Sequence, residues 1–306
     1  MTLAPATHEP LPAGLLDAVA AESDQPVSPD FAPLIDALVQ RFGESLDAVV
    51  LYGSCLHSAI SLDEGIVDLY VVVDDYRKAY PERHLALFNA WLPPNVFYLE
   101  VPHQGKTLRA KYAVISTGDF EAGARWWFHS YIWARFAQPS RLLFARDNAV
   151  RQRLYAAMAH SVLTFLRSGV AALEAGSYSV EQLWTGCLLL TYAAELRAEK
   201  AGRANHLANA NLTAFTCFTA AAHPLLADIL EKQADGCYRC LTDPKTQRQA
   251  LGRWRVRRWQ GRVLSILRLA KATLTFANSV DYAAWKIERH TDRKSTRLNS
   301  SHANIS

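Results

Sequence analysis

The sequence contains no run of 18 uncharged apolar residues, although half of its 306 residues are hydrophobic. A helix needs about 20 such residues to cross a bilayer, so any contact with a membrane is predicted to be peripheral. The high hydrophobic fraction also excludes a disordered chain, because it can build one large core or two modest ones. The formal net charge of +4 is too small to define a partner.

The first 25 residues also lack the features of a leader. They carry four acidic residues, have no basic stretch followed by an apolar one, and are not rich in arginine. Cysteine is scarce, with five in the chain. The one Cys-x-x-Cys pair, Cys237 and Cys240, has only His223 as a further ligand nearby, whereas a structural zinc site needs four ligands. We therefore expect a reducing, cytoplasmic compartment and regard the pair as incidental.

Four segments differ in composition along the chain. Short runs rich in Val, Tyr and Ile alternate with helical patterns over residues 29–147, which predicts an α+β domain with a mixed sheet and flanking helices. Long helical patterns over residues 148–291 predict an all-α domain. Residues 1–28, rich in Pro and Ala, are expected to be poorly ordered. Residues 292–306 resemble a translated sequencing adapter with read-through, an artefact tail outside the fold.

A strand that ends in Tyr52-Gly53-Ser54 is followed, 14 residues after Ser54, by Asp68 in the apolar run GIVDLYVVVDD. Glycine lets a backbone approach a triphosphate closely, and the serine hydroxyl and the turn amides can hold its oxygens. A carboxylate on the next strand can bind magnesium and so support displacement at the α-phosphate. The pattern is typical of nucleotidyltransferases of the polymerase β-like fold, although Gly-Ser after an apolar strand is by itself more often an ordinary turn.

The second carboxylate that most of these enzymes carry two residues after the first is missing, because Tyr70 stands there. Asp74 lies on the same strand face as Asp68, but six residues of extended strand separate them by about 20 Å, too far to share an ion. A further metal ligand must then come from a neighbouring strand. Glu100 in NVFYLEV is the first candidate and Asp119 the second, although an acid at a strand end is usually only solvated.

Five segments in order, YGS, VDLYVVVDD, NVFY, KYAVIS and YIWARFAQPSRLL, resemble the Tam41/Mmp37 family of phosphatidate cytidylyltransferases (CDP-diacylglycerol synthases). The resemblance covers residues 48–145 and extends weakly to LLLTYAAELRAEK. It departs from the family pattern at Cys55, Ala113 and Ala134, where glycine is typical. The implied activity is the transfer of CMP from CTP to phosphatidate, which gives CDP-diacylglycerol and pyrophosphate in phospholipid biosynthesis.

By the same resemblance, the CTP phosphates would be bound by the strand-ending turn and one lysine: Tyr52, Gly53, Ser54 and Lys111. Asp68 would ligate the metal, Mg²⁺ or Mn²⁺, and would act in catalysis with Lys111. Glu100 is kept as a further metal ligand. A lysine that flanks a strand is solvated in most proteins, so the role of Lys111 depends on the resemblance.

The lipid phosphate would be bound by Arg135 and Arg197. Arg135 lies in a segment crowded with aromatic residues, so a packing role is the plain alternative. Arg197 follows Tyr192 and Glu195 in TYAAELRAEK, where the side chains could approach substrate. The same charges are also those of a solvated helix face.

Residues 251–276 carry seven basic residues and no acid, with two tryptophans among them. Each basic residue near an anionic membrane contributes about 1 kcal/mol, and indoles favour the interface. We therefore expect peripheral association with the inner face of the cell membrane through Arg253, Trp254, Arg257, Arg258 and Trp259. A nucleic acid would attract the same charges but is not expected as a partner. A core helix with a solvated basic edge is the alternative, and the oligomeric state is open.

Two other functions also fit the sequence. The first is a nucleotidyltransferase acting on another small-molecule or protein hydroxyl, which would need a general base such as an extra carboxylate near the metal. The second is a degenerate module that binds nucleotide or lipid without catalysis, and its main support is the missing Asp-x-Asp pattern.

Overall fold

The computed structural model describes residues 10–56, 65–195 and 201–275. Its first half is built on a five-stranded mixed sheet of order β3-β4-β2-β1-β5, in which β2 and β4 run parallel and the other neighbours antiparallel. The strands are β1 (Leu46–Tyr52), β2 (Val67–Val73), β3 (Asn95–His103), β4 (Lys106–Ser116) and β5 (Arg141–Ala145). The four runs rich in Val, Tyr and Ile form β1 to β4, as predicted.

Both faces of this sheet are buried. Successive residues of a strand point to opposite sides, so Val49 and Leu51 join one core cluster while Val50 and Tyr70 join the other. The helices around the sheet are α2 (Ala32–Phe42), α3 (Tyr76–Ala79), α4 (Arg83–Trp91), α5 (Thr117–Arg125) and α6 (Trp133–Phe136). Short 3-10 helices stand before α2 (Pro29–Phe31) and after it (Gly43–Ser45). A third, Ser54–Leu56, follows β1. The sheet therefore lies between helices on both sides.

Helices dominate the second half. They are α7 (Asn148–Val170), α8 (Val180–Ala194), α9 (Ala201–Ala210), α10 (Leu212–Ala222) and α11 (Pro244–Thr275). Asp147 caps α7 by accepting from the Val150 amide, and Ser179 starts α8 with a capping box. The predicted α+β class is confirmed, but the second half is not all-α. It also holds a small sheet of β6 (Gly176–Tyr178), β8 (Tyr238–Cys240) and β7 (Leu230–Lys232), whose three-residue strands are too short to give a periodic signal.

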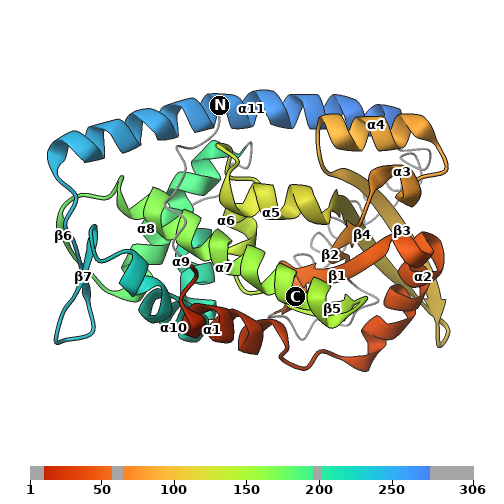
Figure 1. Cartoon of the computed structure of the whole chain (residues 1–306), viewed down its shortest axis with the longest axis horizontal. Helices are drawn as coiled ribbons and strands as arrows, with labels where there is room; N and C mark the ends of the chain where they lie inside the picture. The colour runs from red at the N-terminus through yellow and green to blue at the C-terminus, as the bar shows by residue number, and fades with distance from the viewer. Residues whose placement is uncertain (1–9, 57–64, 196–200, 276–306) are drawn as a thin grey trace, which may run out of the picture.

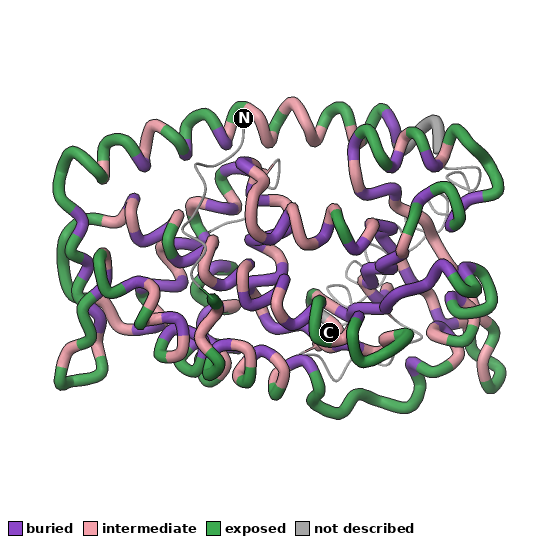
Figure 2. Tube along the Cα trace, in the orientation of Figure 1, coloured by how far each residue is buried: buried purple, intermediate pink, exposed green. Residues whose placement is uncertain are grey.

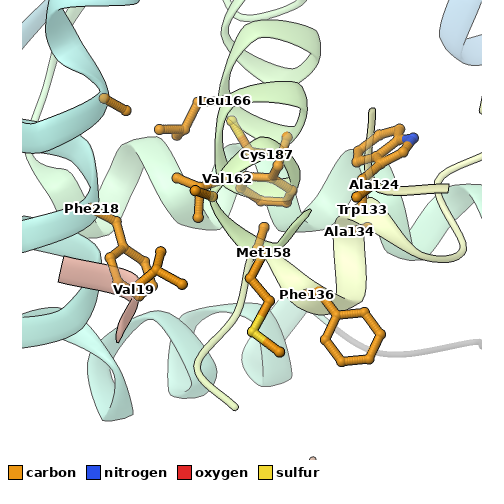
Figure 3. Close-up of a cluster of buried hydrophobic side chains, with 14 of the residues drawn as sticks. Val19, Ala124, Trp133, Ala134, Phe136, Met158, Val162, Leu166, Cys187 and Phe218 are labelled. Atoms are coloured by element: carbon orange, nitrogen blue, oxygen red, sulfur yellow. The ribbon is translucent and has the colours of Figure 1, made fainter. Parts of the chain in front are cut away.

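One apolar core runs from the sheet into the helices across the predicted boundary at residue 147. Figure 3 shows its middle, where Met158, Val162 and Leu166 of α7 lie near Cys187 of α8 and Phe136 of α6. All five side chains are almost inaccessible to solvent. The sheet and the helices of the second half therefore share one continuous core.

The N-terminal segment corrects a prediction. Residues 13–23 form α1 (Ala13–Ser23), and Leu15 and Val19 belong to the main core, so residues 10–28 are not poorly ordered. An ion pair of 2.7 Å between Glu22 and Arg141 ties the end of α1 to β5. Figure 1 shows α1 beside α10. The Pro- and Ala-rich composition concealed an apolar spacing of four residues, which places Leu15 and Val19 on one helix face.

Helix α11 lies along one edge of the molecule, from the three-stranded sheet to α4 (Figure 1). Its inner face carries Trp254 and Arg257, which are 0% and 3% exposed. The indole Nε1 of Trp254 donates to the Ser168 carbonyl at 3.0 Å, and Nε of Arg257 donates to the Phe128 carbonyl at 2.8 Å. Buried purple segments recur along the inner side of this helix in Figure 2.

Two of the five residues expected at a membrane surface are therefore core residues. The prediction is wrong for Trp254 and Arg257, because their helical spacing turns them inward and carbonyl acceptors satisfy their N–H groups. Arg253 and Trp259 are exposed, and Arg258 is half-buried.

This difference gives a direct stability test. Trp254→Ala should lower the free energy of unfolding by about 3–5 kcal/mol, because it removes a large packed side chain and orphans a carbonyl. Trp259→Ala on the same helix, where the side chain is 69% exposed, should change it by no more than about 0.5 kcal/mol. Urea unfolding followed by circular dichroism measures both. Equal losses in the two variants would show that α11 does not dock by this face.

Candidate functional site

Four side chains form a row across one face of the sheet. Tyr52 is paired with Asp68, Asp68 with Lys111, and Lys111 with Tyr98, so all four project to the same side. The row lies at the end of β1, where the chain leaves the sheet through Gly53. The sequence motif and the acid on the next strand are thus neighbours in space.

Gly53 is required by the geometry of this turn. Its φ is +86°, in the region that residues with a Cβ avoid. A Cβ at this position would also lie 3.3 Å from Oδ2 of Asp68. The absence of a side chain therefore brings the backbone of the turn directly against the carboxylate.

A cavity of about 570 Å³ opens beside this turn. Six residues singled out from the sequence line it. They are Tyr52, Gly53, Asp68 and Arg135, together with Tyr192 and Glu195 of TYAAELRAEK. The remaining lining comes from the turn, from the segment around α6, from α8 and α9, and from the residue before α10: Leu56, Ala134, Gln138, Pro139, Thr191, Arg203, His206, Leu207, Ala210 and Asn211. The cavity thus lies between the sheet and the helical half.

Arg135 brings a fixed positive charge to this cavity. Its Nη1 donates to the Tyr70 hydroxyl at 2.8 Å. Its Cζ lies 4.5 Å from the ring centroid of Tyr131 and 5.2 Å from that of Tyr52. Aromatic faces attract a guanidinium, which offsets part of its desolvation. The aromatic packing considered for Arg135 is therefore present, and it holds the charge at the cavity wall.

Tyr131 lies close to a second guanidinium. The Cζ of Arg268 from α11 is 3.9 Å from its ring centroid. Burial raises the pKa of the Tyr131 phenol, but the positive charges of Arg135 and Arg268 outweigh that effect and lower the pKa to about 8. The wall behind Arg135 thus contains a phenol whose pKa lies below that of an ordinary tyrosine.

Several predicted residues lie elsewhere. Lys111 is next to Asp68 in the sheet but is not among the residues that line the cavity. Glu100 is exposed, accepts from the Tyr98 hydroxyl at 2.8 Å and pairs with Arg109 at 3.1 Å. Two strand spacings, roughly 10 Å, separate β3 from β2, so the prediction that Glu100 joins Asp68 is wrong.

The other candidates are accounted for as follows. Asp119 accepts from the Tyr76 hydroxyl at 2.7 Å, and Asp74 pairs with Lys78 at 2.6 Å. Arg197 lies outside the described residues, as does the side chain of Ser54. Cys237 and Cys240 are free thiols in and beside β8.

Glu195 supplies the second carboxylate of the cavity, at the C-terminal end of α8. Among the described residues no group of three or more His, Cys, Asp or Glu side chains could hold a metal ion. Magnesium usually takes one or two carboxylates together with substrate phosphates and water. Asp68 and Glu195 line the same cavity, so each is a candidate ligand if a nucleotide provides the remaining oxygens.

Sequence reasoning missed Arg203 and His206, which line the cavity from α9. Spaced by three, they share a helix face, and the sequence from 201 to 222 has no other basic residue and no acid. Two basic residues in an otherwise uncharged segment could have indicated an anion-binding helix. A helix edge exposed to solvent shows the same pattern.

Comparison with known proteins gives little further detail. No protein-family model and no curated protein matches the chain. Among solved structures, it is similar to a nucleotidyltransferase-like protein from Exiguobacterium sibiricum 255-15, with 8% sequence identity and a TM-score of 0.25. The match covers 65% of this chain and 81% of the other.

The environment of Tyr131 makes its phenol measurable. A rise in tyrosinate absorbance at 295 nm is expected around pH 8 in the folded protein and should disappear in Tyr131→Phe. An unfolded tyrosine has a pKa of about 10, so the unfolded chain binds more protons between these two values. The contribution of Tyr131 to the free energy of unfolding should therefore rise as the pH increases from 8 to 10. A wild-type protein without a phenol that titrates below pH 9 would contradict this account.

Proposed function

We propose that the protein is a nucleotidyltransferase whose active site is the cavity at the end of β1. One observation carries the proposal: the turn at Gly53, the carboxylate of Asp68 and the guanidinium of Arg135 all line a single cavity. A backbone turn and a cation suit the oxygens of a triphosphate, and a carboxylate suits its divalent ion.

The substrates we propose are CTP and phosphatidate. A phosphate oxygen of phosphatidate attacks the α-phosphorus of CTP, the bond from that phosphorus to the bridging oxygen breaks, and pyrophosphate leaves. The acceptor is already an anion near neutral pH, so no protein base is needed. The cavity's cations, Arg135 above all, then stabilise negative charge that develops at the phosphoryl group. The choice of CTP and phosphatidate rests on the five sequence segments that resemble the phosphatidate cytidylyltransferases.

Mg²⁺ is the metal we propose, and Asp68 and Glu195 would hold it. When bound, it would neutralise charge on the triphosphate and on the leaving pyrophosphate. The residues of the chain itself would bind and orient the nucleotide. Gly53 lets the turn approach the phosphates, while the tyrosine rings fix the guanidinium of Arg135.

Glu195 also supports a second candidate function, transfer of a nucleotide to a hydroxyl. That acceptor needs a base near the metal, and an extra carboxylate lines the same cavity as Asp68. The two candidates differ in acceptor. Phosphatidate vesicles should yield a lipid-linked cytidylate under the first, and only a hydroxyl compound should accept the nucleotide under the second.

Asp68→Asn tests the assignment. With labelled CTP, Mg²⁺ and phosphatidate vesicles, this variant should form the lipid-linked cytidylate about 10²–10³-fold more slowly, because it loses the charge that holds the metal. Asp74→Asn, just beyond the end of β2, is the control and should retain activity, because Asp74 lies outside the cavity lining. No lipid product from the wild type, or equal use of ATP and GTP, would refute the proposed reaction. Binding without transfer would favour the degenerate module.

Peripheral binding to an anionic membrane is part of the proposal. No helix among the described residues is long and apolar enough to cross a bilayer. The outer face of α11 exposes Trp259, Ile266 and Leu269 between arginines, and α4 beside it exposes Leu87 and Trp91. Phosphatidate lies in a bilayer, so the enzyme must meet it there. These residues replace Trp254 and Arg257 as the membrane-facing set that we propose.

Sedimentation with vesicles tests this surface. The double variant Trp259→Ser/Leu269→Ser should bind vesicles that contain phosphatidate at least about tenfold more weakly. Burying each apolar side chain in the membrane would contribute about 1.5–3 kcal/mol to the free energy of binding. Leu241→Ser, at a side chain 45% exposed outside α4 and α11, is the control and should bind as the wild type does. Unchanged binding of the double variant would exclude this face.

A further inference from the structure

The wall of the cavity formed by α9 carries two basic residues. Arg203 and His206 are the only basic residues between 201 and 222, a stretch without acids, and both line the cavity. Both side chains are exposed to solvent as well as lining the cavity, so a ligand that enters from solvent can reach them. The other α9 residues that line the cavity are leucine and alanine, so Arg203 and His206 are the two basic side chains of this wall.

The packing of α9 places both basic side chains beside the cavity, where they remain exposed to solvent. Ala204 and Ala208 are fully buried and form the face that packs into the core. Nδ2 of Asn209 donates to Oε1 of Glu181 at 2.8 Å, which ties the end of α9 to the start of α8. The two helices are therefore antiparallel, and the first turn of α9 lies at the end of α8 that carries Glu195.

The cavity consequently has cations on two separate elements. Arg135 is fixed by tyrosine rings from the sheet and from the segment before α6. Arg203 and His206 come from α9, which belongs to the helical half. When two anionic substrates react, the negative charge of both must be neutralised. Basic residues on two walls allow each substrate to bind a separate positive group.

We propose that Arg203 and His206 bind the phosphate monoester of the acceptor, while the β1 turn and Arg135 hold the nucleotide. This inference rests on the proposed nucleotidyl transfer and adds where the acceptor binds. A guanidinium offers paired N–H donors that match two oxygens of one phosphate, and an imidazole can donate to a third. The ligand chemistry is a phosphate monoester, either a lipid headgroup or a soluble ester.

The test uses Arg203→Gln and His206→Gln in the full chain. The KM for the acceptor and the dissociation constant of CTP with Mg²⁺, from equilibrium dialysis, are measured separately. The acceptor is presented in two arms, as phosphatidate in vesicles and as glycerol 3-phosphate. Exposed residues outside the cavity lining give matched controls, Arg239→Gln and His84→Gln. Arg203→Lys tests rescue, because it restores the charge without the paired donors.

Arg203→Gln should raise the acceptor KM by about 10-fold to 100-fold, the loss expected for a charge-assisted hydrogen bond. His206→Gln should raise it less, CTP affinity should stay within about twofold, and Arg203→Lys should recover part of the loss. A higher KM for both phosphatidate and glycerol 3-phosphate would show that the two residues bind the phosphate group itself. A higher KM for phosphatidate alone would show that they bind the lipid headgroup. Unchanged KM in both variants, or weakened CTP binding instead, would overturn the inference. A wild type that transfers nothing would refute the proposed function itself.

Discussion

The structure depends on a guanidinium that is enclosed by aromatic rings. Arg135 lies against Tyr52 from β1, Tyr70 from β2 and Tyr131 from the segment before α6. A desolvated cation is costly unless its surroundings offer it negative potential, and ring faces together with the Tyr70 hydroxyl provide this. The same contacts therefore build the cavity wall and fix α6 on the sheet.

Helix α11 contacts this wall from outside. Arg268 stacks near Tyr131, and the ammonium of Lys271, with a pKa lowered to about 7 mainly by burial, donates to the carbonyls of Leu92 and Pro94. A side chain at Gly261 would clash with the carbonyl of Ala194, so glycine allows α11 to cross closely over the end of α8. That crossing lies one residue from Glu195. Basic residues of α11 thus support the cavity, although their sequence pattern resembles that of a membrane-binding helix.

Local patterns were enough to predict part of the fold and of the candidate site. The β-branched and aromatic runs predicted β1 to β4, and the spacing from Gly53 to Asp68 fits two adjacent strands joined by a short connection. Arg135 followed from a resemblance of ordered segments, and it lines the same cavity.

What the sequence could not predict depends on contacts between distant residues. Glu195 was expected near substrate, but it lies more than a hundred residues from Asp68. The sequence does not show that the packing of α8 against α7 and α9 brings both carboxylates to one cavity. The same holds for Arg203 and His206. Glu100 was a reasonable candidate by strand neighbourhood, but its pairing with Arg109 depends on the register of β3 with β4. Trp254 shows the same limit, because a basic helix with tryptophans does not reveal which face is buried.

A crystal structure with CTP and Mg²⁺ tests the central claim most directly. The triphosphate should lie against the backbone at Gly53, with Asp68 on the metal and Arg135 within hydrogen-bonding distance of a phosphate oxygen. A nucleotide bound elsewhere on the protein, with this cavity empty, would contradict the account.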